Sequence, residues 1–132
     1  MEKAQLLNTT FTFEQVVTED MTASKGVPGT PDVFGTPMLV MMVENTCFKC
    51  MAQAAEEGEV SVGVTVDITH SSPTPVGMKV VCTAKVEKVD KKILTFSFEV
   101  KDEAGVIGTG THVRAYVQKA KIEAKAAAKF NK

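Results

Sequence analysis

The sequence predicts an α+β fold in which a curved antiparallel sheet wraps around one long helix. The chain has 132 residues, 44% of them hydrophobic and 23% charged, which is typical of a single globular domain spanning residues 1–132. One apolar stretch, residues 36–58, has the signals of a helix, and after it the hydrophobic period changes to that of strands. One helix and one apolar sheet face cover each other most simply as two layers.

The segment before the helix contains one expected strand and one long loop. Residues 10–17 place Phe11, Phe13 and Val17 on one face, which favours a strand. Residues 18–35 contain several Gly and Pro residues that break any period. A loop of this length is either a lid or rim of a site or an ordinary surface connection.

The helix expected over residues 36–58 is unusually apolar. Thr36 suits its N-cap, Pro37 its first position and Gly58 its end. Apolar residues on most faces of its first three turns predict a helix that is buried nearly all round. Glu44 stands among apolar neighbours at helical spacing, namely Val40, Met41, Cys47 and Phe48. A carboxylate there loses water, so we expect it to be paired or to have an unusual pKa.

Four strands are expected after the helix, over residues 60–70, 78–86, 94–101 and 106–117. The turns between them are short, which favours an antiparallel meander. In the last strand His112 and Arg114 alternate with the residues expected to face the core. We therefore expect this pair on a solvated or dimer-facing surface, with anion binding as the alternative. Residues 119–132 are rich in Ala and Lys and predict a loosely held helix.

Composition excludes several classes of protein. A formal net charge of −1 argues against nucleic acid or an anionic membrane as the main partner. The N-terminus lacks the apolar core of a signal peptide, and no apolar run approaches the roughly 18 residues of a membrane span. Three cysteines favour a reducing cytoplasm, and Cys47 and Cys50 are better interpreted as core residues than as a zinc or redox motif. Open sheet edges make a homodimer plausible.

Few side chains offer chemistry. Glu44 is a candidate because of its apolar surroundings, and the alternative is a structural carboxylate with a satisfied partner. His70 ends the strand face that packs on the same helix, so the two residues form a candidate acid–base pair, although a lone His is usually structural. Thr36 adds a helix start whose backbone N–H groups suit an oxyanion. Gly63 indicates either a β-bulge or the close approach of a ligand.

These residues, taken together, resemble a known family. The order and spacing of several motifs are similar to those of hot-dog-fold thioesterases of the fluoroacetyl-CoA thioesterase type. Thr36 and Glu44 are 44 − 36 = 8 residues apart, and Glu44 and His70 are 70 − 44 = 26 residues apart. The motifs are Thr36-Pro37 with Glu44, Ser61-Val62-Gly63 with His70, Thr74-Pro75-Val76-Gly77 and Gly108-Thr109-Gly110-Thr111-His112-Val113-Arg114. The resemblance runs from about Phe11 to Val117.

The resemblance implies a hot-dog fold and hydrolysis of an acyl-CoA by a catalytic set of Thr36, Glu44 and His70. It places Gly63 at the acyl thioester and implies a homodimer with sites near the subunit boundary, without metal or cofactor. The fluorine-selective member of the family is associated with an aromatic lid before the catalytic Thr. Phe34 lies near that position and is a candidate substrate contact, but it is not equated with the lid residue. The acyl group is therefore fluoroacetyl or a broader short or aryl group.

Two further hypotheses remain from the sequence. The alternative function is a non-catalytic hot-dog module that binds an acyl thioester or a small hydrophobic ligand. The second hypothesis concerns geometry, because eight residues of straight helix separate the Cα atoms of Thr36 and Glu44 by roughly 12 Å. Either the chain turns back before the helix, or Thr36 of one subunit meets Glu44 of the other, and we predict the second arrangement.

Overall fold

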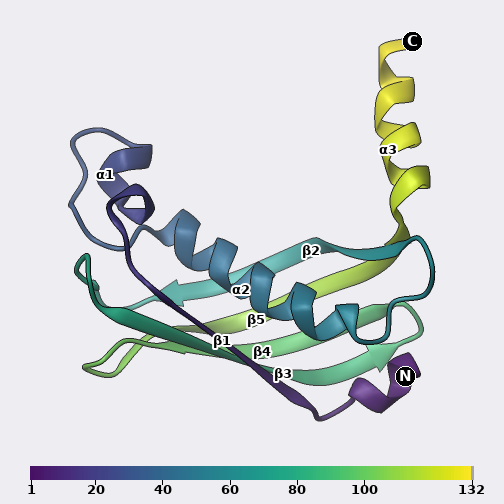
Figure 1. The fold of residues 1–132 in the computed structure, drawn as a ribbon, viewed down its shortest axis with the longest axis horizontal. Helices are drawn as coiled ribbons and strands as arrows, with labels where there is room; N and C mark the ends of the chain where they lie inside the picture. The colour runs from purple at the N-terminus through teal and green to yellow at the C-terminus, as the bar shows by residue number, and fades with distance from the viewer. Residues whose placement is uncertain (132) are drawn as a thin grey trace.

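The computed structural model describes residues 1–131 and shows one antiparallel sheet with a long helix lying across it (Figure 1). The helix is α2, Thr36–Ala52. The strands are β1 (Thr10–Val16), β2 (Glu59–His70), β3 (Lys79–Asp90), β4 (Ile93–Lys101) and β5 (Val106–Gln118). The order across the sheet is β1-β3-β4-β5-β2. The predicted α+β architecture of a curved sheet around a central helix is confirmed.

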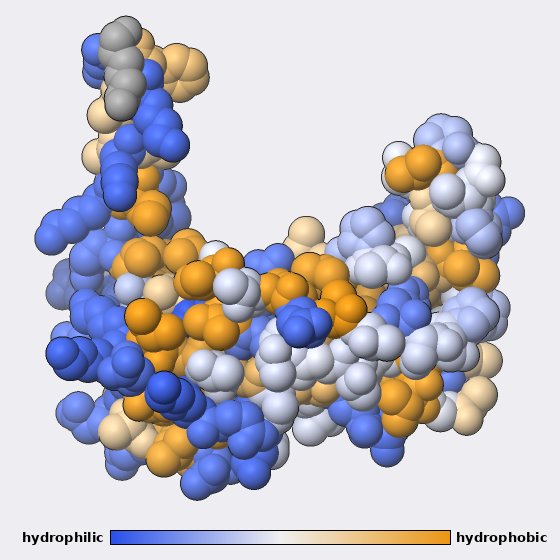
Figure 2. All heavy atoms as spheres, turned by 180° about the vertical axis from the view of Figure 1, so that it is seen from behind, coloured by the Kyte–Doolittle hydropathy of each residue, from blue (hydrophilic) through white to orange (hydrophobic). Residues whose placement is uncertain are grey.

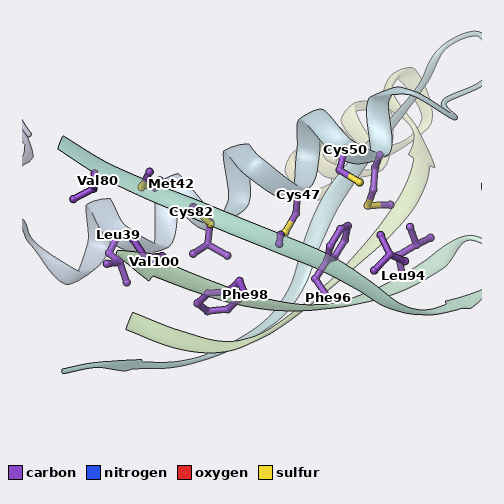
Figure 3. Close-up of a cluster of buried hydrophobic side chains, with 14 of the residues drawn as sticks. Leu39, Met42, Cys47, Cys50, Val80, Cys82, Leu94, Phe96, Phe98 and Val100 are labelled. Carbon is purple, nitrogen blue, oxygen red and sulfur yellow. The ribbon is translucent and has the colours of Figure 1, made fainter. Parts of the chain in front are cut away.

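The core fills the space between α2 and the middle strands. Figure 3 shows the helix residues Leu39, Met42 and Cys47 directed at the sheet, opposite side chains of β3 and β4. The buried residues of these two strands are Val80, Cys82, Ala84, Val86, Leu94, Phe96, Phe98 and Val100. They are the residues that the period of two predicts, and burying each large one contributes about 1.5–3 kcal/mol.

The expected four-strand meander is wrong at one connection. β3, β4 and β5 follow one another, but β2 pairs with β5 and lies at the edge of the sheet. Residues 71–78 therefore cross from one edge of the sheet to β3. Eight residues reach roughly 26 Å, whereas three strand spacings take only about 14 Å, so this short segment can make the crossing.

Helix α2 begins and ends differently from the prediction. Gly35 is its N-cap, so Thr36 is the first helical residue and its hydroxyl is not used as a cap. The helix ends at Ala52, six residues before Gly58, which adopts a φ of +76° in the turn into β2. A positive φ suits glycine because a Cβ would be strained there.

One face of α2 stays exposed in the single chain, contrary to the predicted burial nearly all round. Leu39, Val43 and Cys47 belong to its buried stripe, while Met41 and Phe48 are exposed. The apolar side chains on this outer face are not covered by the chain's own sheet. The apolar composition of the helix therefore reflects two different faces, of which only one packs on the core.

The remaining helices are short. The loop before α2 contains the 3-10 turn η2 (Glu19–Met21) and α1 (Ala23–Gly26), and the chain starts with η1 (Lys3–Leu6). The predicted C-terminal helix appears as α3 (Lys119–Ala127), followed by η3 (Ala128–Asn131), and it projects away from the sheet (Figure 1). None of residues 119–127 is buried. Among the described residues, no helix has the length and apolarity needed to cross a membrane.

Candidate active site

Thr36 and His70 meet at the N-terminal end of α2. Thr36 Oγ1 lies 2.7 Å from His70 Nδ1, a short hydrogen bond. His70 is the last residue of β2. The next residue, Ser71, donates its backbone N–H to the Ile107 carbonyl of β5, which fixes the chain where it leaves the strand. The crossing segment is fixed to the loop before α2, because the Phe34 N–H donates to the Thr74 carbonyl at 2.9 Å. These contacts hold the strand end and the helix start together.

An open hollow of about 270 Å³ lies beside this pair. Thr36, His70 and Phe34 line it, together with neighbours from residues 71–73. Phe34 is only 1% exposed, so most of its ring belongs to the core and only a small part can face a ligand. A second hollow of about 180 Å³, lined mainly by apolar atoms, lies between the loop and the first turn of α2, where Val27, Pro37 and Met38 contribute.

Glu44 occupies a different place, near the middle of α2. Its Oε2 atom lies 3.2 Å from Nη1 of Arg114, and the Glu44 side chain is 39% exposed. The expectation of a paired carboxylate is confirmed, although the partner comes from β5 of the same chain. Within residues 1–131, the structure gives the other carboxylate oxygen no hydrogen-bond partner.

Arg114 is buried under α2, so the expectation of a solvated or dimer-facing surface for His112 and Arg114 is wrong. The Arg114 side chain is 5% exposed, and its Nε–H donates to Ser61 Oγ at 2.9 Å while Nη2 donates to the Ser61 carbonyl at 2.8 Å. The reason is that β5 turns its alternate polar residues toward the helix, where Ser61 and Glu44 satisfy the guanidinium. A buried arginine is tolerated only with such partners.

Gly63 makes room for the Glu44 carboxylate. It lies opposite Arg114 in the β2–β5 pairing, and the register shifts between Gly63 and Thr65, which leaves Val64 as the extra residue of a bulge. A Cβ on Gly63 would lie 2.9 Å from Glu44 Oε2. The predicted bulge is therefore confirmed, while the approach of a ligand at Gly63 stays a prediction, since the group close to this backbone is the Glu44 carboxylate of the same chain.

The bulge also explains the position of His70. Before it, the odd-numbered Ser61 faces the helix, whereas after it Ile68 packs against the core and His70, two residues later, reaches Thr36. A one-residue insertion reverses which residues point inward. The predicted face of His70 is therefore right only because the strand changes phase at Val64.

The three predicted catalytic residues form two separate groups in one chain. Thr36 bonds to His70, and Glu44 pairs with Arg114, with no hydrogen bond between the two groups among the described residues. The Nε2 atom of His70 is covered and has no hydrogen-bond partner within residues 1–131. In the first turn of α2 the N–H groups of Met38 and Leu39 both donate to the Gly35 carbonyl, and Pro37 has no N–H group. Of the N–H groups in this described turn, that of Thr36 is therefore the one left to bind an oxyanion.

The sequence predicts Glu44, His70, Thr36 and Gly63 as site residues but favours the wrong face for Arg114. The available signal was its alignment with the small residues Ser61 and Gly63, which leave space for a long side chain on the helix side of the sheet.

The sequence and the fold agree with those of known thioesterases. A family profile described as fluoroacetyl-CoA-specific thioesterase matches residues 17–120. The fluoroacetyl-CoA thioesterase of Streptantibioticus cattleyicolor is 37% identical over 95 residues, which cover 72% of this chain and 68% of that protein.

Solved structures give the same result. A crystal structure of a mutant of the fluoroacetyl-CoA-specific thioesterase FlK matches with a TM-score of 0.90 and 32% identity, over 93% of this chain and 96% of that one. A Thermus thermophilus hypothetical protein of the thioesterase superfamily matches with a TM-score of 0.85 and 30% identity, over 95% of this chain and 93% of that one.

The molecule thus has the hot-dog fold and is a thioester hydrolase. Within that class the chain belongs to the fluoroacetyl-CoA-specific thioesterase family, because both the family profile and a relative above 30% identity cover most of its length.

Proposed function

We propose that the protein hydrolyses a short or aryl acyl-CoA thioester to the free acid and CoA with Thr36, Glu44 and His70. The observation that carries this proposal is the 2.7 Å bond between Thr36 and His70 at the edge of an open hollow. A related FlK mutant was solved with fluoroacetate and CoA, which supports an acyl-CoA as the substrate. The apolar hollow of about 180 Å³ by Pro37 and Met38 has room for roughly six water molecules, which suits a small acyl group.

In this mechanism Glu44 starts the attack on the thioester carbonyl carbon. It acts either as a nucleophile, forming an anhydride that water then opens, or as a base that takes a proton from the attacking water. In both routes the C–S bond breaks, and the CoA sulfur leaves as a thiolate that takes up a proton. His70 moves protons for the water or the thiolate, while Thr36 orients His70 and the substrate. Gly63 leaves space for the carbonyl next to the carboxylate.

In the proposed site the two groups of residues meet across two subunits. We propose a homodimer in which Thr36 and His70 of one chain face Glu44 of the other. β2 is an edge strand, and an exposed strand edge readily pairs with a second copy. Val64 and Val66 on β2 and Met41 and Phe48 on α2 are exposed in the single chain.

The surface supports such an interface. Figure 2, which views the molecule from behind Figure 1, shows hydrophobic residues gathered in a band across the middle, beneath a concave outline between two projecting ends. The hydrophilic residues lie mainly toward its ends and lower rim. A hydrophobic centre with a polar surround is typical of subunit interfaces.

The expected compartment is the cytoplasm. Cys47, Cys50 and Cys82, which make up the chain's cysteines, are buried free thiols in the described structure. Their state suits a reducing environment. The proposed partners, which rest on the family and on the exposed apolar surface, are an acyl-CoA and a second copy of this chain, without nucleic acid or membrane.

The test follows free CoA thiol during incubation with acetyl-, fluoroacetyl-, benzoyl- and phenylacetyl-CoA. A thioesterase releases thiol with at least one of them at a rate that saturates with substrate, and E44Q serves as the matched blank. The alternative function, a non-catalytic binding module, predicts that the same thioesters bind, as seen by calorimetry, while wild-type and E44Q release thiol equally slowly. That outcome would remove the hydrolase proposal for these acyl groups.

A further inference from the structure

The chain has two histidines, and the proposed mechanism uses only one of them. The other, His112, is completely buried on β5 beneath α2. Its Nδ1 atom lies 2.7 Å from the Thr65 carbonyl oxygen, and its Nε2 atom lies 3.3 Å from Nη1 of Arg114. A buried imidazole with both nitrogens in contact has a fixed orientation, and the contacts identify where its proton resides.

Both contacts require the same tautomer. A carbonyl oxygen only accepts hydrogen bonds, so Nδ1 of His112 carries the proton that it donates to Thr65. A guanidinium only donates, so Nε2 of His112 is unprotonated and accepts from Arg114. A charged imidazole has donors on both nitrogens and would turn an N–H toward the N–H groups of Arg114.

The same Arg114 nitrogen serves Glu44. Nη1 has two hydrogens, and its two neighbours are His112 Nε2 and Glu44 Oε2 at 3.3 and 3.2 Å. Ser61 holds the opposite side of the guanidinium through its hydroxyl and carbonyl oxygens. Ser61 therefore fixes two donors of Arg114, and His112 fixes the nitrogen that meets the carboxylate.

We propose that His112 is a positioning residue: as the neutral Nδ1–H tautomer it aims Arg114, and through Arg114 it holds the Glu44 carboxylate beside Gly63. The proposal rests on the proposed function, because it assumes that Glu44 is the reacting carboxylate. It adds that the hydrogen bond from His112 to the carbonyl of Thr65, the residue after the bulge, connects the backbone near Gly63 with the orientation of Glu44.

The charges around His112 favour this neutral form. Burial and the Arg114 cation lower the pKa of His112, while the hydrogen bond to Thr65 and the Glu44 carboxylate oppose that shift. From α2, Glu44 and Cys47 face this region, and burial raises the pKa of the Cys47 thiol, which therefore stays uncharged. The neighbouring strands contribute the Thr65 backbone from β2 and the apolar Phe96 from β4. His112 thus remains neutral at pH 7.

The first experiment reads the tautomer directly from the ¹⁵N and ¹³C shifts of the two imidazoles in the wild-type protein at pH 7. We expect one of them, assigned as His112 by its loss in H112Q or by through-bond assignment, to be neutral and protonated at Nδ1. A proton on Nε2, or a charged ring, would overturn the proposal. This measurement needs no functional variant, so it decides the question even if a substitution prevents folding.

The second experiment separates kcat from KM in H112L and H112Q. H112L keeps an apolar side chain but removes the acceptor, and we expect kcat to fall about 10- to 100-fold while KM changes less than about twofold, because misplacing a reacting group by about 1 Å costs up to 10². H112Q restores an uncharged acceptor for Arg114 and should recover most of kcat. Y116F is the matched control. Tyr116 lies on the same strand as His112, and the substitution removes its buried hydrogen bond to the Met51 carbonyl of α2 without touching Glu44.

The outcomes distinguish this inference from the proposed function. If E44Q is inactive while folded H112L keeps the wild-type kcat, only the positioning role fails. If E44Q keeps the wild-type rate, the proposed function itself fails. A loss in Y116F equal to that in H112L would show a general effect of core damage and would also overturn the positioning role.

Discussion

Two glutamates of this molecule are held by cations in the same fold, yet their surroundings differ. The Glu59 side chain is 0% exposed and has Lys3 Nζ at 2.7 Å, Lys92 Nζ at 3.0 Å and the Glu56 N–H at 2.9 Å. Glu44 is 39% exposed, and the structure shows Arg114 as the cation that holds it, through one oxygen.

The difference between Glu59 and Glu44 shows how the surroundings of a carboxylate suit it either to stabilising the fold or to reacting with a substrate. Glu59 Oε1 binds Lys3 and the Glu56 N–H, whereas Oε2 has Lys92 Nζ at 3.0 Å as an ion pair without hydrogen-bond geometry. These partners join the N-terminal turn to the start of β2, and the carboxylate is fully buried, so Glu59 can stabilise the fold but is not accessible to a substrate. The Glu44 carboxylate is oriented at one oxygen, and its side chain is 39% exposed. A group that is positioned yet incompletely satisfied is suited to reaction.

The sharpest way to break this comparison is to neutralise each glutamate in turn. E44Q should lose about 10²- to 10⁴-fold in turnover, the range for a positioned acid–base group, while its thermal midpoint stays close to that of the wild type. Thiol release and calorimetric unfolding measure the two quantities. E59Q is the matched control and should show the reverse behaviour, and a wild-type rate in E44Q would refute the catalytic assignment.

Gly63 tests whether the carboxylate needs its present position. In G63A the new Cβ would lie 2.9 Å from Glu44 Oε2 and 3.4 Å from His112 Cε1, so the carboxylate must move. We expect kcat to fall about 10- to 100-fold, because small misplacements of reacting groups have effects of this size. G26A is the control for stability, since a Cβ on Gly26 has no atom within 4 Å. Equal kcat in G63A and wild type would contradict the account.

Glu59 tests the stabilising half of the comparison. Its replacement by Gln leaves Lys3, whose side chain is 15% exposed, without its closest ion partner. Lys3 keeps Glu56 at 3.1 Å and the Ala54 carbonyl at 3.2 Å, so we expect the free energy of unfolding in urea to fall by about 1.5–3 kcal/mol, the range for losing a hydrogen bond to a charged group. The specific activity of the folded fraction should remain unchanged. A variant as stable as the wild type would show that this ion cluster is replaceable.

The smallest effect, a dependence on pH, sharpens the same point. Burial raises the pKa of Glu59, but hydrogen bonds from Lys3, the Glu56 N–H and Lys92 outweigh it and lower the pKa from 4.5 to about 2. Since the folded pKa lies below the unfolded one, the stabilisation is complete above about pH 4.5 and is lost as the pH falls toward 2. The stability gap between wild type and E59Q should therefore narrow over this interval. A gap that stays constant down to pH 2.5 would contradict the ion-pair explanation.

The sequence predicts the helix, the strands and the central candidates because these depend on local patterns. The alternation in β3 and β4 identifies their buried residues, and the apolar surroundings of Glu44 in α2 single it out. The crossing of residues 71–78 is different, because a short segment fits either a turn or a crossover. Its course follows from contacts with residues distant in sequence, such as the bond between Phe34 and Thr74.

The polar side chains of β5 could not be placed for a related reason. His112 and Arg114 resemble a solvated strand face unless Ser61, Thr65 and Glu44 are known to lie opposite them. A buried arginine is stable only with partners from other elements, and periodicity carries no information about those partners. The bulge at Val64 likewise depends on the pairing of β2 with β5.

The most direct test of the central claim mixes two inactive variants. If Glu44 of one subunit acts with Thr36 and His70 of the other, a heterodimer of E44Q and H70N contains one intact site and one doubly altered site. After random subunit exchange, half of the dimers are mixed and each has one of two sites, so the account predicts recovery of about a quarter of wild-type turnover. Turnover no higher than that of the separate variants, with mixed dimers verified by mass spectrometry, would contradict it.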